Sequence, residues 1–130
     1  MILITQAWPL LVFIAGFQLK HFVCDGPLQT LAMVKSKAIY GDHMGLVHAA
    51  IHGVGTLFVL ACAGSAISTM LFLAALDFII HYHVDYGKEN IVKHFKWTTL
   101  DAKFWWALSA DQTLHQLTYL GLVALALTAA

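Results

Sequence analysis

The chain has 130 residues, and its composition is that of a membrane protein. Hydrophobic residues make up 60% of it, charged residues only 11%, and the mean hydropathy is +0.76. Soluble domains carry about 25% charged residues, so this chain is too poor in charge for an ordinary soluble domain. The net charge is zero and no basic block is present, which argues against nucleic acid as a partner. We expect a lipid bilayer to surround most of the chain.

Four mostly apolar stretches follow one another along the chain, at residues 2–23, 44–65, 67–86 and 107–129. A helix of about 20 residues crosses a hydrocarbon layer about 30 Å thick. A spanning segment must satisfy its own backbone hydrogen bonds, so these stretches are predicted to be helices. The expected fold is all-α, an up-down bundle of four transmembrane helices that forms one domain over residues 1–130.

The lysines indicate how this bundle is oriented. There is no arginine, and all seven lysines fall in or beside two connections: Lys20, Lys35 and Lys37 in the first, and Lys88, Lys93, Lys96 and Lys103 in the second. By the positive-inside rule both connections are cytoplasmic, and both termini lie on the outer, periplasmic side. We expect a multi-pass protein of the bacterial inner membrane. The second connection, 87–104, is either an amphipathic segment on the headgroup surface or a solvated loop.

Each apolar stretch carries or borders one pair of histidine or aspartate residues spaced by four positions. This spacing places both side chains on one face of a helix. In an up-down bundle the four pairs share one end, the cytoplasmic one, where neighbouring helices pack about 8–10 Å apart. The eight side chains are therefore predicted to converge: His21 and Asp25, His48 and His52, His81 and Asp85, and Asp111 and His115.

Five imidazoles and three carboxylates form a nitrogen and oxygen ligand set, which suits zinc, iron or manganese. Eight groups exceed the four ligands of a single zinc ion, so we expect one ion with surrounding partners, or two ions. His48 and His52 have the spacing of zinc ligands, but the glutamate of zinc proteases does not follow His48. In a hydrolase, either Asp25, Asp85 or Asp111 would have to be the base, or a metal-bound hydroxide would act directly.

Three other interpretations of these pairs remain open. They could form a purely structural polar network, hold a b-type haem between His48 or His52 and His115, or relay protons or ions. The almost purely apolar outer half counts against a relay. Asp77 stands four residues before His81, and we expect it to hold that imidazole in one tautomer.

The motifs resemble a known family. The chain carries in order a histidine and an aspartate, Leu28-Gln29, a histidine pair, His81 with Asp85-Tyr86 and Lys88, and Asp111-Gln112 with His115. This order resembles the bacterial and phage family called domain of unknown function 3307, over nearly the whole chain. The resemblance implies a membrane location. The family is similar to small multi-span proteins suspected of metal-dependent hydrolysis, which is an analogy only.

The functional hypothesis is a membrane protein with a metal site at the cytoplasmic end of its bundle, and the activity considered for that site is metal-dependent hydrolysis. Lys88, Lys35 or Lys20 at the rim could hold a phosphate or a lipid headgroup. The alternative is a non-catalytic subunit of a larger membrane assembly, or a homo-oligomer, with a structural metal or polar network. A haem-binding electron carrier is the second alternative.

Overall fold

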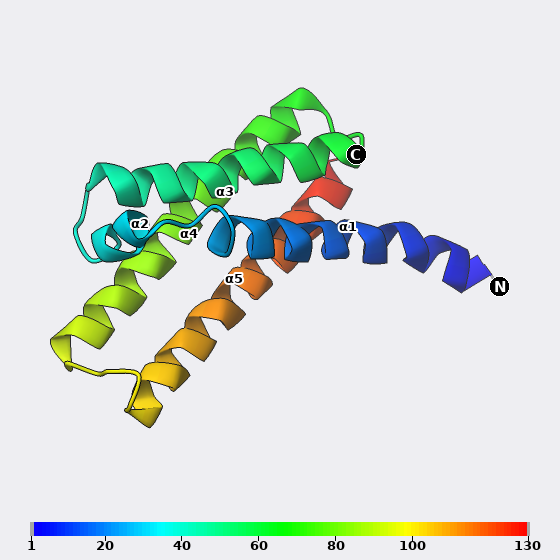
Figure 1. Ribbon diagram of the computed structural model, residues 1–130. Helices are drawn as coiled ribbons and strands as arrows, with labels where there is room; N and C mark the ends of the chain where they lie inside the picture. Colours follow the sequence, from blue (N-terminus) through cyan, green and yellow to red (C-terminus); the bar gives the residue numbers. More distant parts are fainter. Residues whose placement is uncertain (1, 130) are drawn as a thin grey trace.

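Four long helices and one short helix make up the chain, as the computed structural model of residues 2–129 shows (Figure 1). The long helices pack in a closed ring, because α1 contacts α3 and α5, α3 contacts α4, and α4 contacts α5. They alternate in direction, so both chain ends lie at one end of the molecule (Figure 1). The elements are α1 (Ile2–Asp25), α2 (Leu31–Ser36), α3 (His43–Cys62), α4 (Ile67–His94) and α5 (Ala102–Thr128).

Three helices, rather than the four expected, are long and apolar enough to cross a membrane. They are Ala7–Asp25 within α1, the whole of α3, and α4. The fourth predicted span lies on α5, which is 27 residues long but is not among them. Its first half is too polar, because Ser109, Asp111, Gln112, Thr113 and His115 interrupt the apolar sequence. The prediction of four spans is therefore corrected to three candidates on apolarity, although four long helices are present.

Helix α4 is longer than predicted. It was expected to end at residue 86, where glycine and lysine follow, but it continues through residues 87–94. Val92 in this added segment is buried, so packing sustains the helix. The chain then turns at Lys96, which has a φ of 54°. The backbone N–H and the hydroxyl of Thr98 donate hydrogen bonds to the Asp101 carboxylate. These bonds, the backbone one most strongly, hold the pKa of Asp101 below its ordinary value.

The connection between α1 and α3 folds back over one end of the ring through the short helix α2. The side chain of Thr30 caps α2 by accepting from the backbone of Met33. Met33 and Ser36 are buried, and α2 packs against α3. The two helices approach closely at Gly45, where an added Cβ would lie 3.4 Å from the Ser36 hydroxyl oxygen, at contact distance. As a result the residue after α2, Lys37, is buried rather than solvated.

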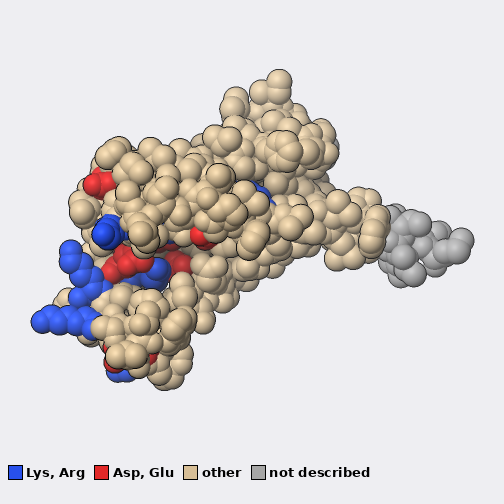
Figure 2. Space-filling view, viewed as in Figure 1, with Lys and Arg blue, Asp and Glu red and all other residues tan. Residues whose placement is uncertain are grey.

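The interior is apolar towards the end that carries the termini. Phe17 of α1 and Tyr119 of α5 stack with ring centroids 5.3 Å apart, and Leu60, Leu73 and Leu122 pack in the same cluster. The outer surface is also apolar. Large side chains such as Phe58 and Ile67 are more than 70% exposed, as suits a surface that meets lipid. Most charged atoms in view gather at the opposite end, near α2 and the α4–α5 connection (Figure 2).

Candidate metal centre

The eight histidine and aspartate residues predicted to converge form one connected network at the end of the ring opposite the termini. Each long helix contributes one pair, and every pair is joined to another helix by contacts of 2.8–3.5 Å. On α1 and α4 each pair comes at the end of an apolar segment or just after it. On α3 and α5 each pair comes at the start of one. The alternating helix directions therefore bring all four to the same depth.

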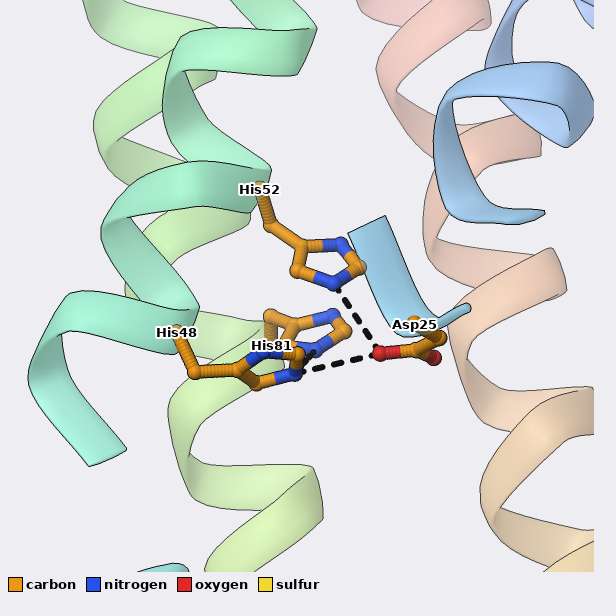
Figure 3. Close-up of side chains that lie close together, drawn as sticks. All are labelled: Asp25, His48, His52 and His81. Carbon is orange, nitrogen blue, oxygen red and sulfur yellow. Dashed lines mark hydrogen bonds and ion pairs between the residues drawn. The ribbon is translucent and has the colours of Figure 1, made fainter. Parts of the chain in front are cut away.

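One group of four ligand atoms is especially compact. The Oδ1 atom of Asp25 lies 3.1 Å from His48 Nε2 and 3.2 Å from His52 Nε2, and His48 Nε2 lies 3.3 Å from His81 Nε2 (Figure 3). These four residues offer ligand atoms that all lie within 4.8 Å of one another. Bonds of about 2.0–2.2 Å to a tetrahedral ion place neighbouring ligand atoms about 3.3–3.6 Å apart. The group therefore has nearly the size of a metal coordination shell.

Two imidazole nitrogens face each other in this group. His48 Nε2 and His81 Nε2 are 3.3 Å apart, and neither Nδ1 atom has a hydrogen-bond partner among the residues that the structure describes. Two lone pairs at this distance repel, and so do two N–H groups. Each nitrogen also faces a carboxylate oxygen, His48 Nε2 at 3.1 Å from Asp25 and His81 Nε2 at 3.3 Å from Asp85, so protons directed at the carboxylates or a cation among these atoms would relieve the repulsion. Both rings are about 1% exposed.

A second group adjoins the first and shares His81 with it. His81, Asp85 and His115 also offer ligand atoms within 4.8 Å of one another. Asp85 points one carboxylate oxygen at His81, at 3.3 Å, and the other at His115, at 3.5 Å. His81 uses the same Nε2 atom towards both groups, and one nitrogen atom binds one ion. Asp85 has two oxygens that face different imidazoles, so it could bridge two ions or support one from the side.

Asp111 lies at the far edge of this second group. Its Oδ1 atom is 3.5 Å from His115 Nε2, which is too long for a good hydrogen bond. Within residues 2–129 neither atom has a hydrogen-bond partner, and both are buried. Asp111 is not a member of either compact group. It lies next to the second group, on the side of His115.

His21, the remaining predicted ligand, also lies beside the groups. Its Nδ1 atom is 2.8 Å from the hydroxyl of Tyr119, and its Nε2 atom is 2.9 Å from Gln112 Oε1 and 3.1 Å from Asp25 Oδ2. Both ring nitrogens are therefore engaged by protein groups. In this arrangement His21 orients Asp25, whose other oxygen faces His48 and His52. Partners of this kind set the direction and basicity of metal ligands.

Two lysines are buried in the network: Lys20, which the sequence placed at the rim, and Lys37 of the first connection. Lys37 lies 2.8 Å from Asp85 Oδ2. Lys20 donates to Asp77 Oδ2 at 2.6 Å, and its Nζ atom is 3.2 Å from His52 Nδ1. The expectation that Asp77 holds His81 is therefore wrong. Asp77 receives hydrogen bonds from Lys20 and Thr56 instead, since α4 turns it towards α1 and α3.

The network carries more negative than positive fixed charge. Its four carboxylates belong to Asp25, Asp77, Asp85 and Asp111, and its two ammonium groups to Lys20 and Lys37. Two negative charges remain in a largely buried place, where uncompensated charge is costly. One divalent cation would balance them, and so would two protonated imidazoles.

Three histidines stand outside the network. His83 contacts the Ile79 carbonyl and the Tyr40 hydroxyl, and His43 and His94 are exposed. Tyr119 and Gln112 were not predicted as functional residues. For Gln112 the signal was present, because it adjoins Asp111. Tyr119 could have been found as one further i+4 step along the helix face of Asp111 and His115.

The comparison with protein families gives one match, to the family described as protein of unknown function (DUF3307), over residues 12–130. The chain belongs to the DUF3307 family. The matched range contains all eight network residues, so the resemblance of their motifs to this family is confirmed. Among the curated proteins no similar sequence was found. No solved structure matches either.

Proposed function

We propose that this DUF3307 protein is an integral membrane protein whose His/Asp network binds a divalent metal ion for hydrolysis. The observation that carries the proposal is the compact group of Asp25, His48, His52 and His81, with neighbouring ligand atoms 3.1–3.3 Å apart. Nitrogen and oxygen ligands of this kind suit zinc, iron or manganese. Asp85, with oxygens directed at both groups, supports one ion or bridges two.

We further propose that α5 crosses the membrane with the three apolar helices, in a four-helix bundle. Its charged and imidazole side chains, Asp111 and His115, are buried inside the ring, whereas Leu114, Leu117 and Leu120 face outwards. A helix of this kind needs its partners to shield its polar face. The exposed lysines of both long connections favour a cytoplasmic location for the network end, in the bacterial inner membrane.

The ion and the residues around it would have different roles in hydrolysis. A bound divalent cation would polarise the substrate and activate water at neutral pH. Asp111 is the best candidate for the base, because its Oδ1 atom is buried, unpaired within the described chain, and outside the ligand groups. Asp25 has a side chain that is 19% exposed, so the compact group is open to a ligand on that side.

The hydrolytic proposal is tested with detergent-solubilised protein loaded with zinc or manganese. We expect slow, metal-dependent cleavage of an activated phosphodiester or carboxylic ester, lost on chelation. The Asp111→Asn variant should keep its metal and lose about 10²–10⁴-fold in turnover, the usual contribution of a positioned base. The matched control is Asp101→Asn, an exposed carboxylate outside the network. Metal-loaded protein without turnover on either class of substrate would contradict the proposal.

A structural metal in a non-catalytic subunit is the second candidate. It is favoured by the depth of the ligands, since His48, His52 and His81 are each about 1% exposed or less. Structural metal sites typically have all their coordination positions filled by protein ligands, with none left for water. The geometry argues against haem, because the His81 ring stacks on the rings of His52 and His115, with ring centroids 3.5 Å and 4.0 Å apart. No gap is left there for a macrocycle.

A further inference from the structure

A cleft between α4 and α5 reaches the network from the side. It has a volume of about 1190 Å³ including its open mouth, and its wall includes Val84, Ile91, Ala107 and Leu114. Most of these lining side chains are apolar, as in typical ligand sites. The cleft lies on the side of the ring formed by α4 and α5.

Asp111 connects this cleft to the network. It lines the cleft, its side chain is about 3% exposed, and its Oδ1 atom has no hydrogen-bond partner within residues 2–129. The same oxygen lies 3.5 Å from His115 Nε2. A molecule in the cleft would therefore touch Asp111 while it remained in contact with apolar side chains of two helices.

The rim of the cleft is positive and aromatic. Lys88 and Lys103 line it together with Trp97 and Trp106. Lys88 is paired with Glu89, whereas Lys103 has no carboxylate partner among the described residues and lies over the Trp97 ring, with Nζ 5.9 Å from its centroid. Tryptophan and lysine at a helix end are typical of the membrane interface. The free ammonium group would attract an anion at that depth.

We infer that the cleft binds a lipid with an anionic phosphate headgroup, placing the headgroup at Lys103 and Lys88 and an acyl chain along the apolar wall. A positive rim above an apolar wall complements such a lipid in charge and in polarity. A soluble anion would leave the wall without a partner. The inference deepens the proposed function, on which it rests, by giving the enzyme an amphiphilic phosphate-containing substrate class that reaches Asp111 from the bilayer.

The test counts phosphatidylglycerol molecules retained by the full chain in native mass spectrometry, with phosphatidylcholine as the uncharged-headgroup comparison. We expect one phosphatidylglycerol to bind in preference to phosphatidylcholine. Lys103→Gln should weaken that binding about fivefold, as expected for one lysine at an anionic surface. Lys93→Gln, which removes an exposed lysine outside the cleft, is the matched control and should change it less than twofold.

Two further variants make the result decisive. Ala110→Trp should abolish the bound lipid without a change of charge, because Ala110 lines the cleft. His48→Ala/His52→Ala should retain the lipid, so loss of metal and loss of lipid are separable failures. Equal effects of Lys103→Gln and Lys93→Gln, or unchanged binding in Ala110→Trp, would overturn the inference. Displacement of the lipid by inorganic phosphate alone would also overturn it, in favour of a soluble anion.

Discussion

Replacement of Lys20 by methionine is expected to destabilise the protein by about 3–5 kcal/mol, the cost of leaving a buried charge without its partner. Lys20 and Asp77 are 2.6 Å apart, with side chains 3% and 1% exposed. The pair lies on the side of the network that adjoins the apolar core, where Lys20 contacts Tyr119. Without the ammonium group, Asp77 would keep, among the described residues, only the hydrogen bond from Thr56.

The double variant Lys20→Met/Asp77→Leu separates the pair from its surroundings. When both charges are replaced by apolar groups of similar volume, much of the lost stability should return. Lys35→Met is the matched single control, because Lys35 is exposed on α2, and it should change stability by less than about 0.5 kcal/mol. Unfolding in mixed micelles measures all three. A Lys20→Met variant as stable as Lys35→Met would show that Lys20 does not balance Asp77.

Asp85→Asn is expected to weaken metal binding about a hundredfold. Asp85 contacts three imidazoles, those of His48, His81 and His115, and it lies between the two groups of ligand atoms. Asparagine keeps its shape but loses the charge that draws a cation to this position. Changes to groups that orient or support ligands commonly cost about 10–100-fold in affinity, and Asp85 is itself a candidate ligand.

A companion variant separates this effect from the loss of an ion pair. Asp85 also holds Lys37, at 2.8 Å, so Asp85→Asn breaks that pair as well. Lys37→Gln breaks the same pair and leaves the carboxylate, and it should bind metal at least as tightly as the unmodified protein. Competition with a fluorescent chelator measures both affinities. Equal weakening in the two variants would mean that the ion pair, rather than the ligand, matters.

Much of the network could be predicted from sequence because helix geometry is regular. Pairs spaced by four, such as His48 and His52, share a helix face, and the alternation of apolar stretches placed all pairs at one end. Lys20 and Lys37 were misjudged for a related reason. Lysines at helix ends usually reach water, and only tertiary packing shows that α2 folds Lys37 inwards and that Lys20 turns towards Asp77.

The extents of the helices were harder to predict. The first three residues beyond Asp85 include a glycine and a lysine, which suggested a helix end, but buried Val92 extends α4 to His94. For α5, apolarity alone does not indicate a candidate membrane span, because this helix carries a polar face that is buried against other helices. The division of roles among the eight residues also depends on which atoms face one another. Spacing could not show that His21 contacts Tyr119 and Gln112 and meets the compact group only through Asp25.

The central claim, that the network binds metal, is tested most directly by elemental mass spectrometry of protein purified without added metal. We expect at least one equivalent of zinc, iron or manganese per chain. His48→Ala/His52→Ala should lose it, while His43→Ala/His94→Ala, which removes two exposed imidazoles outside the network, should keep it. Folded protein without metal, and unable to take up zinc or manganese on addition, would contradict the claim and leave a structural polar network.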